Sequence, residues 1–277
     1  MKTTRDLVPS RQMDESSRIQ RSRSFGGVAD VYERARPSYP IDAVRWLSGE
    51  SPGRVLDLGS GTGKLTADLV GLGHEVIAAD PSAPMLRRLH DAVPQAYPMQ
   101  SGAESIGLAT SSVDVVVAGQ AFHWFEPGDA LPEIARVLRP GGTLALVWNF
   151  RDESVPWVRR LSAVIGTEDW TGLVDPVKES ELFGEVEHKR FRFWQPVDRE
   201  GLLGLVRSRS YVATLGEAER GDLLAKVGAL YDHYGRGADG MLLPYVTECY
   251  RARVSGSANV TNRFGGPDDD GLLIDFR

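Results

Sequence analysis

The sequence is poor in cysteine, because Cys249 is the only one among its 277 residues. One cysteine excludes an internal disulfide and any metal centre built from several cysteines. The scattered histidines show no metal-ligand spacing either, so we expect no bound metal. A chain without disulfides is compatible with a reducing compartment, and we expect a cytoplasmic protein.

Long apolar runs and an excess of basic residues are also missing. No run approaches the roughly 20 residues of a membrane-spanning helix, and the first 24 residues lack the apolar core of a signal peptide. The net charge of −6 provides no general positive field for nucleic acid. We therefore expect no membrane or nucleic-acid partner, and a monomer or homodimer.

The two ends of the chain are polar and rich in turn-forming residues. We expect a disordered N-terminal arm at 1–24 and a flexible C-terminal tail at 255–277. No linker rich in proline or glycine divides residues 25–254, so this stretch is expected to form one domain.

Five short apolar segments alternate with helical patterns in the first half of the chain. The segments at 54–58, 74–80, 96–102, 113–119 and 143–149 predict strands, and 139–142 predicts a tight turn. Apolar spacing predicts helices at 25–36, 64–72, 81–92 and 131–138. Strands that alternate with helices indicate an α/β fold with a doubly wound, Rossmann-like sheet of five parallel strands.

The second half shows a different pattern. Segments 186–197 and 242–254 alternate like half-exposed strands, whereas 156–166, 199–215 and 217–235 have helical spacing. A strand, a helical insertion and a second strand indicate an antiparallel addition at the sheet edge. The inserted helices, at about 199–235, are expected to form a helical cap.

Three glycines, Gly59, Gly61 and Gly63, follow the first strand in "VLDLGSGTGKL". Glycines there let a ligand approach the backbone, and the N-terminus of the next helix suits an anion. A phosphate-binding loop is excluded, because Leu58 replaces its first glycine and Leu65 its Ser/Thr.

Two other glycine motifs fit less than fully. The dinucleotide fingerprint G-x-G-x-x-G needs its third glycine where this chain has Lys64, so the match is partial. An esterase elbow would use Ser60 as the nucleophile, but Leu58 occupies its first glycine position.

The same stretch closely resembles the first motif of class I S-adenosylmethionine-dependent methyltransferases. "VIAADPSAPML", "SGAESIGL", "VDVVVAGQAFHWF" and "EIARVLRPGGTLALVWN" resemble the later motifs of that family, in its order. "FGGVADVYERARPSYP" is similar to the stretch that precedes the first motif. The resemblance covers roughly residues 25–255 and is closest to the small-molecule group near trans-aconitate and ubiquinone-type C-methyltransferases. It implies S-adenosylmethionine as cofactor and a small-molecule acceptor.

The resemblance also implies roles for the residues at the strand ends. Gly59, Gly61 and Gly63 would bring the backbone close to the methionine part of the cofactor. Asp57 would hold the methionine amine, and Asp80 would accept hydrogen bonds from both ribose hydroxyls.

The remaining cofactor residues follow from the later motifs. Met85 would cover the adenine, and Ala103 and Glu104 would contact its edge. Gln120 and Ala121 would line the floor where the methyl group emerges.

His123 and Trp124 would also line this floor, on the acceptor side. His123 is a candidate general base for a hydroxyl or an acidic carbon, whereas a carboxylate acceptor needs no base. By resemblance, the N-terminal helix with Tyr32 and Arg36 closes over the cofactor. Arg36 can pair there with an anion.

Arg207 and Tyr211 lie in the expected cap, where an acidic acceptor would bind. Structural interpretations stay open for all these residues. Asp80 can cap a helix, Met85 can be a core residue, and Arg207 can face solvent.

The expected reaction is transfer of a methyl group to a carboxylate, a hydroxyl or an activated carbon. One alternative is an NAD(P)-dependent oxidoreductase, which the residue at position 64 disfavours. The other alternative is a cofactor-binding protein without turnover.

Overall fold

The structure, a computed structural model, describes residues 36–167, 171–235 and 240–255. Our expectations for the arm at 1–24, the tail beyond residue 255 and nearly all of the helix at 25–36 therefore lie outside the described residues.

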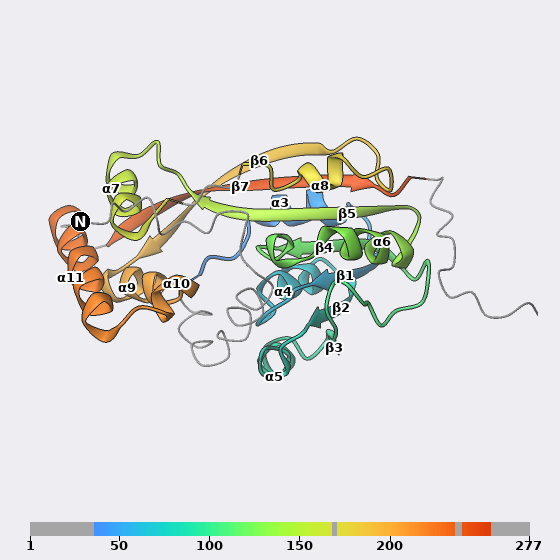
Figure 1. Ribbon diagram of the computed structural model, residues 1–277, viewed down its shortest axis with the longest axis horizontal. Helices are drawn as coiled ribbons and strands as arrows, with labels where there is room; N and C mark the ends of the chain where they lie inside the picture. Colours follow the sequence, from blue (N-terminus) through green and yellow to red (C-terminus); the bar gives the residue numbers. More distant parts are fainter. Residues whose placement is uncertain (1–35, 168–170, 236–239, 256–277) are drawn as a thin grey trace, which may run out of the picture.

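Within the described residues, seven strands form one mixed sheet in the order β3-β2-β1-β4-β5-β7-β6 (Figure 1). The first five strands in this order are parallel, and β7 is antiparallel to both of its neighbours. The expected parallel sheet with an antiparallel edge addition is confirmed. The strands are β1 (Arg54–Leu58), β2 (Glu75–Asp80), β3 (Tyr97–Gln100), β4 (Val113–Gly119), β5 (Leu138–Arg151), β6 (Glu187–Val197) and β7 (Met241–Arg253).

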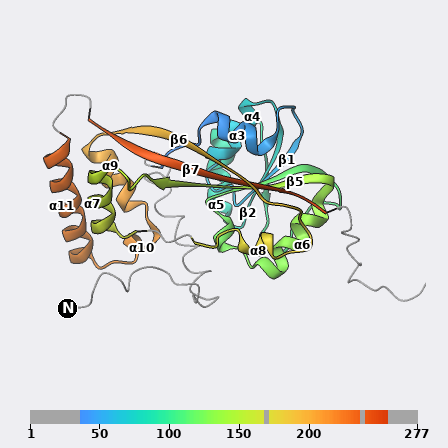
Figure 2. The ribbon, with the colours of Figure 1, turned by 90° about the horizontal axis from the view of Figure 1, so that it is seen from above.

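Helices cover both faces of the sheet, as a doubly wound fold requires. Figure 2 shows α3 (Ile41–Ser48) and α4 (Lys64–Gly71) on one face, and α6 (Pro127–Val137) and α8 (Asp175–Lys178) on the other. Leu47 and Leu69 pack on Val55 and Val117 on the first face. On the second face, the apolar side of α6 packs on the alternate residues of the central strands. The helix α5 (Ala83–Ala92) lies against β2 and β3.

The expected turn at 139–142 is part of β5 in the structure. Val113 of β4 pairs with Leu138, but Val115 pairs with Thr143, so the four intervening residues of β5 bulge out of the pairing. Gly141 has a positive φ of 75° within the bulge. Leu138 also begins this strand and does not end the preceding helix, which ends at Val137. The predicted end of the helix at Leu138 and the predicted start of the strand at Thr143 were both wrong. Helical spacing and a turn sequence do not reveal that this segment pairs with β4.

A second hydrophobic cluster lies away from the sheet's centre. Helices α7 (Pro156–Ile165), α9 (Arg199–Arg207), α10 (Ser210–Ala213) and α11 (Glu217–Tyr234) form it together with the ends of β6 and β7. Figures 1 and 2 show these helices at one end of the molecule, reached by the long strands β5, β6 and β7. We call this group of four helices the cap; it contains α7 in addition to the helices expected at 199–235. Among the described residues, no helix combines the length and the apolar character needed to cross a membrane.

Candidate active site

The candidate site lies at the carboxyl ends of three neighbouring parallel strands. Because β2, β1 and β4 are adjacent, the loops that follow them meet at one edge of the sheet. These loops carry the three glycines, Asp80 and Gln120. Open α/β sheets bind their ligands at this edge.

The glycine loop has a backbone that only glycine fits. Gly59 has a φ of +75°, and a Cβ atom there would lie 2.5 Å from the Cβ atom of Ala121. Gly63 has a φ of +92°, and its Cβ atom would lie 2.9 Å from Cγ of Leu89. At Gly61, in contrast, no atom of the described residues lies within 4 Å of the position of a Cβ atom. The loop is therefore packed at both ends and open at its middle glycine.

Asp80 ends β2 and binds the glycine loop directly. Its Oδ2 accepts the amide hydrogen of Gly61 at 3.0 Å, and its Oδ1 accepts that of Ser82 at 2.8 Å. Burial raises the pKa of Asp80 above its ordinary value, and the two amide hydrogen bonds oppose this rise. A carboxylate has about four acceptor positions, and the described residues fill only part of those of Asp80.

Asp57 lies beneath the loop and is almost fully buried, with 1% of its surface exposed. The hydroxyl of Thr66 donates a hydrogen bond to its Oδ2 at 2.6 Å. Burial raises the pKa of Asp57 to about 7, and the nearby charge of Asp80 contributes to the rise, whereas Thr66 lowers it. A cation next to Asp57 would favour its ionised form.

The hydroxyl of Ser60 differs from the other polar groups of the loop. Among the described residues, the buried Oγ of Ser60 makes no hydrogen bond. The amides of Gly59 and Ser60 both donate to the carbonyl of Ala79, at 2.8 and 3.0 Å, so the backbone of the loop is held while this hydroxyl is not. A buried polar atom of this kind is costly unless a ligand or water satisfies it.

The loop after β4 packs against the glycine loop. Gln120 has a φ of +55°, which is unusual for a residue with a side chain. Its amide donates to the carbonyl of Val147 at 2.8 Å, and its Nε2 donates to the carbonyl of Asn149 at 3.2 Å. Ala121 is buried and packs against Gly59. Strained backbone that is held in this way is frequent at functional sites.

His123 and Trp124 follow in the short 3₁₀ helix η3 (Phe122–Trp124). Their rings lie 4.9 Å apart at an angle of 42°. The Nε1 of Trp148, a fully buried residue of β5, donates to Nδ1 of His123 at 3.5 Å. When Nδ1 of a neutral imidazole accepts a hydrogen bond, Nε2 carries the hydrogen.

The residues expected near the adenine lie around the other side of β2. Met85 is 5% exposed on α5 and packs in the core. Ala103 is buried in the loop after β3, and Oε1 of Glu104 accepts the amide hydrogen of Glu126 at 3.0 Å. The exposed fraction of Met85 fits the core interpretation as well as the adenine one.

Of the remaining predicted residues, Arg207 and Tyr211 lie in the cap and Arg36 contacts it. Arg36 donates to the carbonyl of Ser208 at 3.5 Å. Arg207 is exposed and lies 3.8 Å from Glu200 in an ion pair on the same helix. The hydroxyl of Tyr211 donates to the carbonyl of Ile165 at 2.6 Å and thereby joins α10 to α7. Tyr32 lies outside the described residues.

The sequence analysis missed Asn149, which joins the loop after β4 to two distant segments of the chain. This buried side chain accepts the hydroxyl hydrogen of Thr247 at 2.7 Å and donates to the carbonyl of Ser38 at 3.2 Å. Its own carbonyl accepts from Gln120. The available signal was a lone amide at the end of an otherwise apolar strand, which predicts a buried polar network.

An acid lies at or next to the end of each of two adjacent strands, Asp57 in β1 and Asp80 in β2, beside a glycine loop, and this arrangement is typical of nucleoside-binding α/β proteins. Comparison with known proteins specifies its chemistry. The family described as a methyltransferase domain matches residues 56–146. An uncharacterized methyltransferase of Mycobacterium tuberculosis is 44% identical over 241 residues, which cover 86% of this chain and 99% of that protein.

Less similar proteins are also named as methyltransferases or methyltransferase-like. An uncharacterized methyltransferase-like protein of Schizosaccharomyces pombe is 38% identical over 206 residues, which cover 70% of this chain and 79% of that one. A solved structure from Anaeromyxobacter dehalogenans, assigned to the type II methyltransferases, aligns with a TM-score of 0.62 and 27% identity over 79% of this chain and 97% of that one. The chain belongs to the class I S-adenosylmethionine-dependent methyltransferases, as its motifs indicated.

The residues at the site fit the cofactor that this family implies. Gly61 leaves space for a ligand beside the backbone, and the hydroxyl of Ser60 lacks a partner within the described part of the chain. Asp80 retains acceptor positions for a diol, and the buried carboxyl of Asp57 would be stabilised in its ionised form by an ammonium group next to it.

Proposed function

We propose that the enzyme binds S-adenosylmethionine at the edge formed by β2, β1 and β4 and methylates a small-molecule acceptor. In this proposal the methionine part lies against Gly61, with its ammonium group near Asp57. The ribose hydroxyls donate to Asp80. The adenine lies between Met85 and the loop that carries Ala103 and Glu104.

One observation carries the proposal: Gly61, the glycine of this loop that the described residues leave open, is hydrogen-bonded to the carboxylate of Asp80. A ligand that approaches the backbone there also meets an acceptor suited to a diol. The buried hydroxyl of Ser60 supplies a further polar group beside it.

When bound, the cofactor supplies an electrophilic methyl group on a sulfonium. The chain's own residues then orient the acceptor and exclude water. We assign this task to Gln120, Ala121, His123 and Trp124, on the floor after β4. The held, positive-φ backbone of Gln120 supports a fixed floor.

The acceptor is a carboxylate, a hydroxyl or an activated carbon. His123 is our candidate base for the latter two, and its contact with Trp148 orients the ring. Because Nδ1 accepts that hydrogen bond, proton uptake at Nδ1 would require Trp148 to move away. A carboxylate acceptor avoids this cost, since it is already ionised at neutral pH.

The cap is the proposed source of acceptor specificity. Tyr211 and Arg207 are our candidates there, although each already has a partner within the cap. Their contribution would therefore need exchange of those contacts for contacts with the acceptor.

Calorimetric titration with S-adenosylhomocysteine and, separately, with NAD tests the cofactor assignment. We expect micromolar binding of the first ligand only, weakened at least about tenfold, or about 1.4 kcal/mol, by Asp80→Ala. Asp91→Ala, an exposed acid on α5, is the matched control and should leave the affinity unchanged. Binding of NAD, or of neither ligand, would overturn the proposal.

An acceptor screen follows from the same chemistry. The enzyme is incubated with S-adenosylmethionine and a panel of small carboxylic acids and phenols, and formation of S-adenosylhomocysteine is measured. Turnover of phenols that survives His123→Gln would assign His123 to the floor and exclude it as their base, whereas turnover of carboxylic acids should survive this change in either case.

A further inference from the structure

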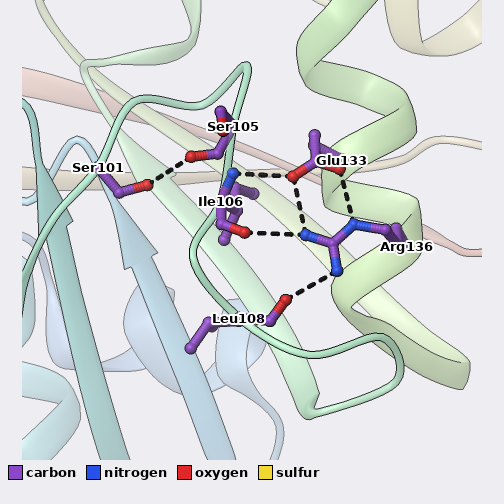
Figure 3. Close-up of polar contacts among 6 residues, drawn as sticks. All are labelled: Ser101, Ser105, Ile106, Leu108, Glu133 and Arg136. Carbon is purple, nitrogen blue, oxygen red and sulfur yellow. Dashed lines mark hydrogen bonds and ion pairs between the residues drawn. The ribbon is translucent and has the colours of Figure 1, made fainter. Parts of the chain in front are cut away.

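The segment between β3 and β4, residues 101–112, has little regular structure of its own. Its first turn is closed by a bridge between Gly102 and Ser105, and Oγ of Ser101 donates to the carbonyl of Ser105 at 2.9 Å (Figure 3). This turn carries the two residues assigned above to the adenine. We call residues 101–108 the adenine loop, and we ask what fixes its position.

An ion pair on α6 forms hydrogen bonds with the backbone of the adenine loop. Glu133 and Arg136 lie one turn apart, with Nε of Arg136 donating to Oε1 of Glu133 at 2.6 Å. The same guanidinium donates to the carbonyl of Ile106 at 2.8 Å and to that of Leu108 at 2.7 Å. Oε2 of Glu133 accepts the amide hydrogen of Ile106 at 2.8 Å. Figure 3 shows both side chains pointing from the helix toward the loop.

The start of α6 holds the loop as well. Glu104 accepts the amide hydrogen of Glu126, the residue that precedes the first turn of α6. Alternate loop residues, Glu104, Ile106 and Leu108, are thus attached to the helix from its N-terminal end to its last turn. The helix α6 therefore holds in place the adenine loop, which has little secondary structure of its own.

The geometry of the pair suits this task. Both side chains are about three-quarters buried, so water competes less for their hydrogen bonds than at an open surface. The hydrogen bonds to Arg136 lower the pKa of Glu133. Only a guanidinium offers five donors in a rigid fork, and here it binds one carboxylate and two carbonyls at once.

We propose that Glu133 and Arg136 are positioning residues for cofactor recognition, because they fix the loop that reads the adenine edge. This inference rests on the proposed function. Its specific content is that the pair, although it does not touch the cofactor, decides how well adenine is distinguished from other bases.

The test compares two ligands that differ at that edge alone. S-Adenosylhomocysteine and S-inosylhomocysteine have inverted donor and acceptor groups at positions 1 and 6 of the base. A fixed loop that hydrogen-bonds this edge rejects the inverted pattern, because its polar groups would be left unpaired. Calorimetry of the wild-type enzyme should therefore show a preference for adenine of about tenfold or more.

Arg136→Gln removes the fork, and Arg139→Gln is the matched control. Arg139 belongs to a separate ion pair, with Asp114, three residues further along the chain. We expect Arg136→Gln to weaken binding of S-adenosylhomocysteine about tenfold and to reduce the adenine preference to less than about threefold. Arg139→Gln should change neither quantity by more than about twofold.

Arg136→Lys keeps the charge but cannot bind all three partners, so its adenine preference should lie between those of the wild type and Arg136→Gln. Amide hydrogen exchange gives a ligand-free readout: exchange at Ile106 should accelerate in Arg136→Gln, while exchange in β1 and β4 stays unchanged. Accelerated exchange in those strands would mark a folding defect, and the comparison then rests on the Arg136→Lys variant.

The outcomes separate the two proposals. Failure of the wild type to bind S-adenosylhomocysteine would overturn the proposed function and this inference with it. Binding by the wild type with no adenine preference, or with a preference that both Arg136 variants retain in full, would overturn this inference alone.

Discussion

Asp57 and Thr66 form a buried hydrogen bond of 2.6 Å beneath the glycine loop, and this bond is the main local support for a charge at Asp57. This hydrogen bond does not fully offset the effect of burial on the carboxyl group. Burial outweighs it and raises the pKa of Asp57 from 3.8 to about 7. The ligand-free enzyme therefore holds a carboxyl group that changes its protonation near neutral pH.

The first prediction concerns stability. A pKa raised on folding means that the folded state binds the proton more tightly than the unfolded state. The contribution of Asp57 is therefore fully present below pH 3.8 and is lost progressively as the pH rises toward 7. Asp57→Asn removes this loss and keeps an acceptor for Thr66. Thermal unfolding between pH 5 and 8 should show the variant gaining stability relative to the ligand-free wild type as the pH rises.

The second prediction concerns proton release. If the cofactor's ammonium group lies next to Asp57, binding shifts that carboxyl toward its ionised form. Binding of S-adenosylhomocysteine near pH 6.5 should therefore release a proton, and Asp57→Asn should not. Calorimetry in two buffers of different ionisation enthalpy measures the number of protons released. Equal proton release by both proteins would place the ammonium group elsewhere.

The third prediction concerns His74, a buried residue outside the site. Its Nδ1 accepts the amide hydrogen of Gly53 at 3.1 Å, and its Nε2 lies 2.9 Å from Oγ of Ser48. Burial lowers the pKa of His74 below its ordinary value of 6.5. Protonation would also break the bond from Gly53, since Nδ1 would become a donor.

Rising pH has opposite effects on the stability contributions of His74 and Asp57. Its contribution to stability is present above pH 6.5 and is lost as the pH falls below 6.5 and through the lower folded-state pKa. His74→Asn should therefore flatten the loss of stability between pH 7 and 5 in denaturant titrations. His90→Asn, at an exposed position on α5, should keep the wild-type slope.

The fourth prediction separates packing from ligand access in the glycine loop. Gly59→Ala must displace Ala121, so overpacking and left-handed backbone together should cost about 2–5 kcal/mol. Gly61→Ala adds only the backbone strain, about 1–2 kcal/mol, because its Cβ atom meets no atom of the described part of the chain. Both variants should lose binding of S-adenosylhomocysteine, but only Gly59→Ala should lower the unfolding midpoint strongly. Wild-type affinity in Gly61→Ala would show that no ligand approaches that position.

Much of this architecture could be predicted from local sequence. A continuous apolar strand such as β4 has few alternatives to burial in a parallel sheet, and it was located correctly. An acid and three alternating glycines predicted a tight loop after β1, and all three glycines have a positive φ there, while ligand binding at this loop stays a prediction. These signals succeed because the pattern and the structure it predicts are only a few residues long.

Features that depend on distant pairing could not be predicted in this way. The helical spacing of α7 gave the helix but not its partners, α9 and α11, which are brought near by the long strands. The spacing of Glu133 and Arg136 in the sequence indicates only an ordinary ion pair on one face of a helix. Their contact with the loop at Ile106, 27 or more residues away, depends on the fold.

The last prediction concerns Tyr211, for which the structure offers a role different from the one its position suggested. Its hydroxyl joins α10 to the end of α7, so Tyr211→Phe should destabilise the cap by about 1 kcal/mol. The affinity for S-adenosylhomocysteine should not change, because this contact lies within the cap. Once an acceptor is found, its KM decides between the two roles. A KM raised several-fold with kcat and cofactor affinity unchanged assigns the hydroxyl to acceptor binding, whereas an unchanged KM leaves Tyr211 as a strut between two helices.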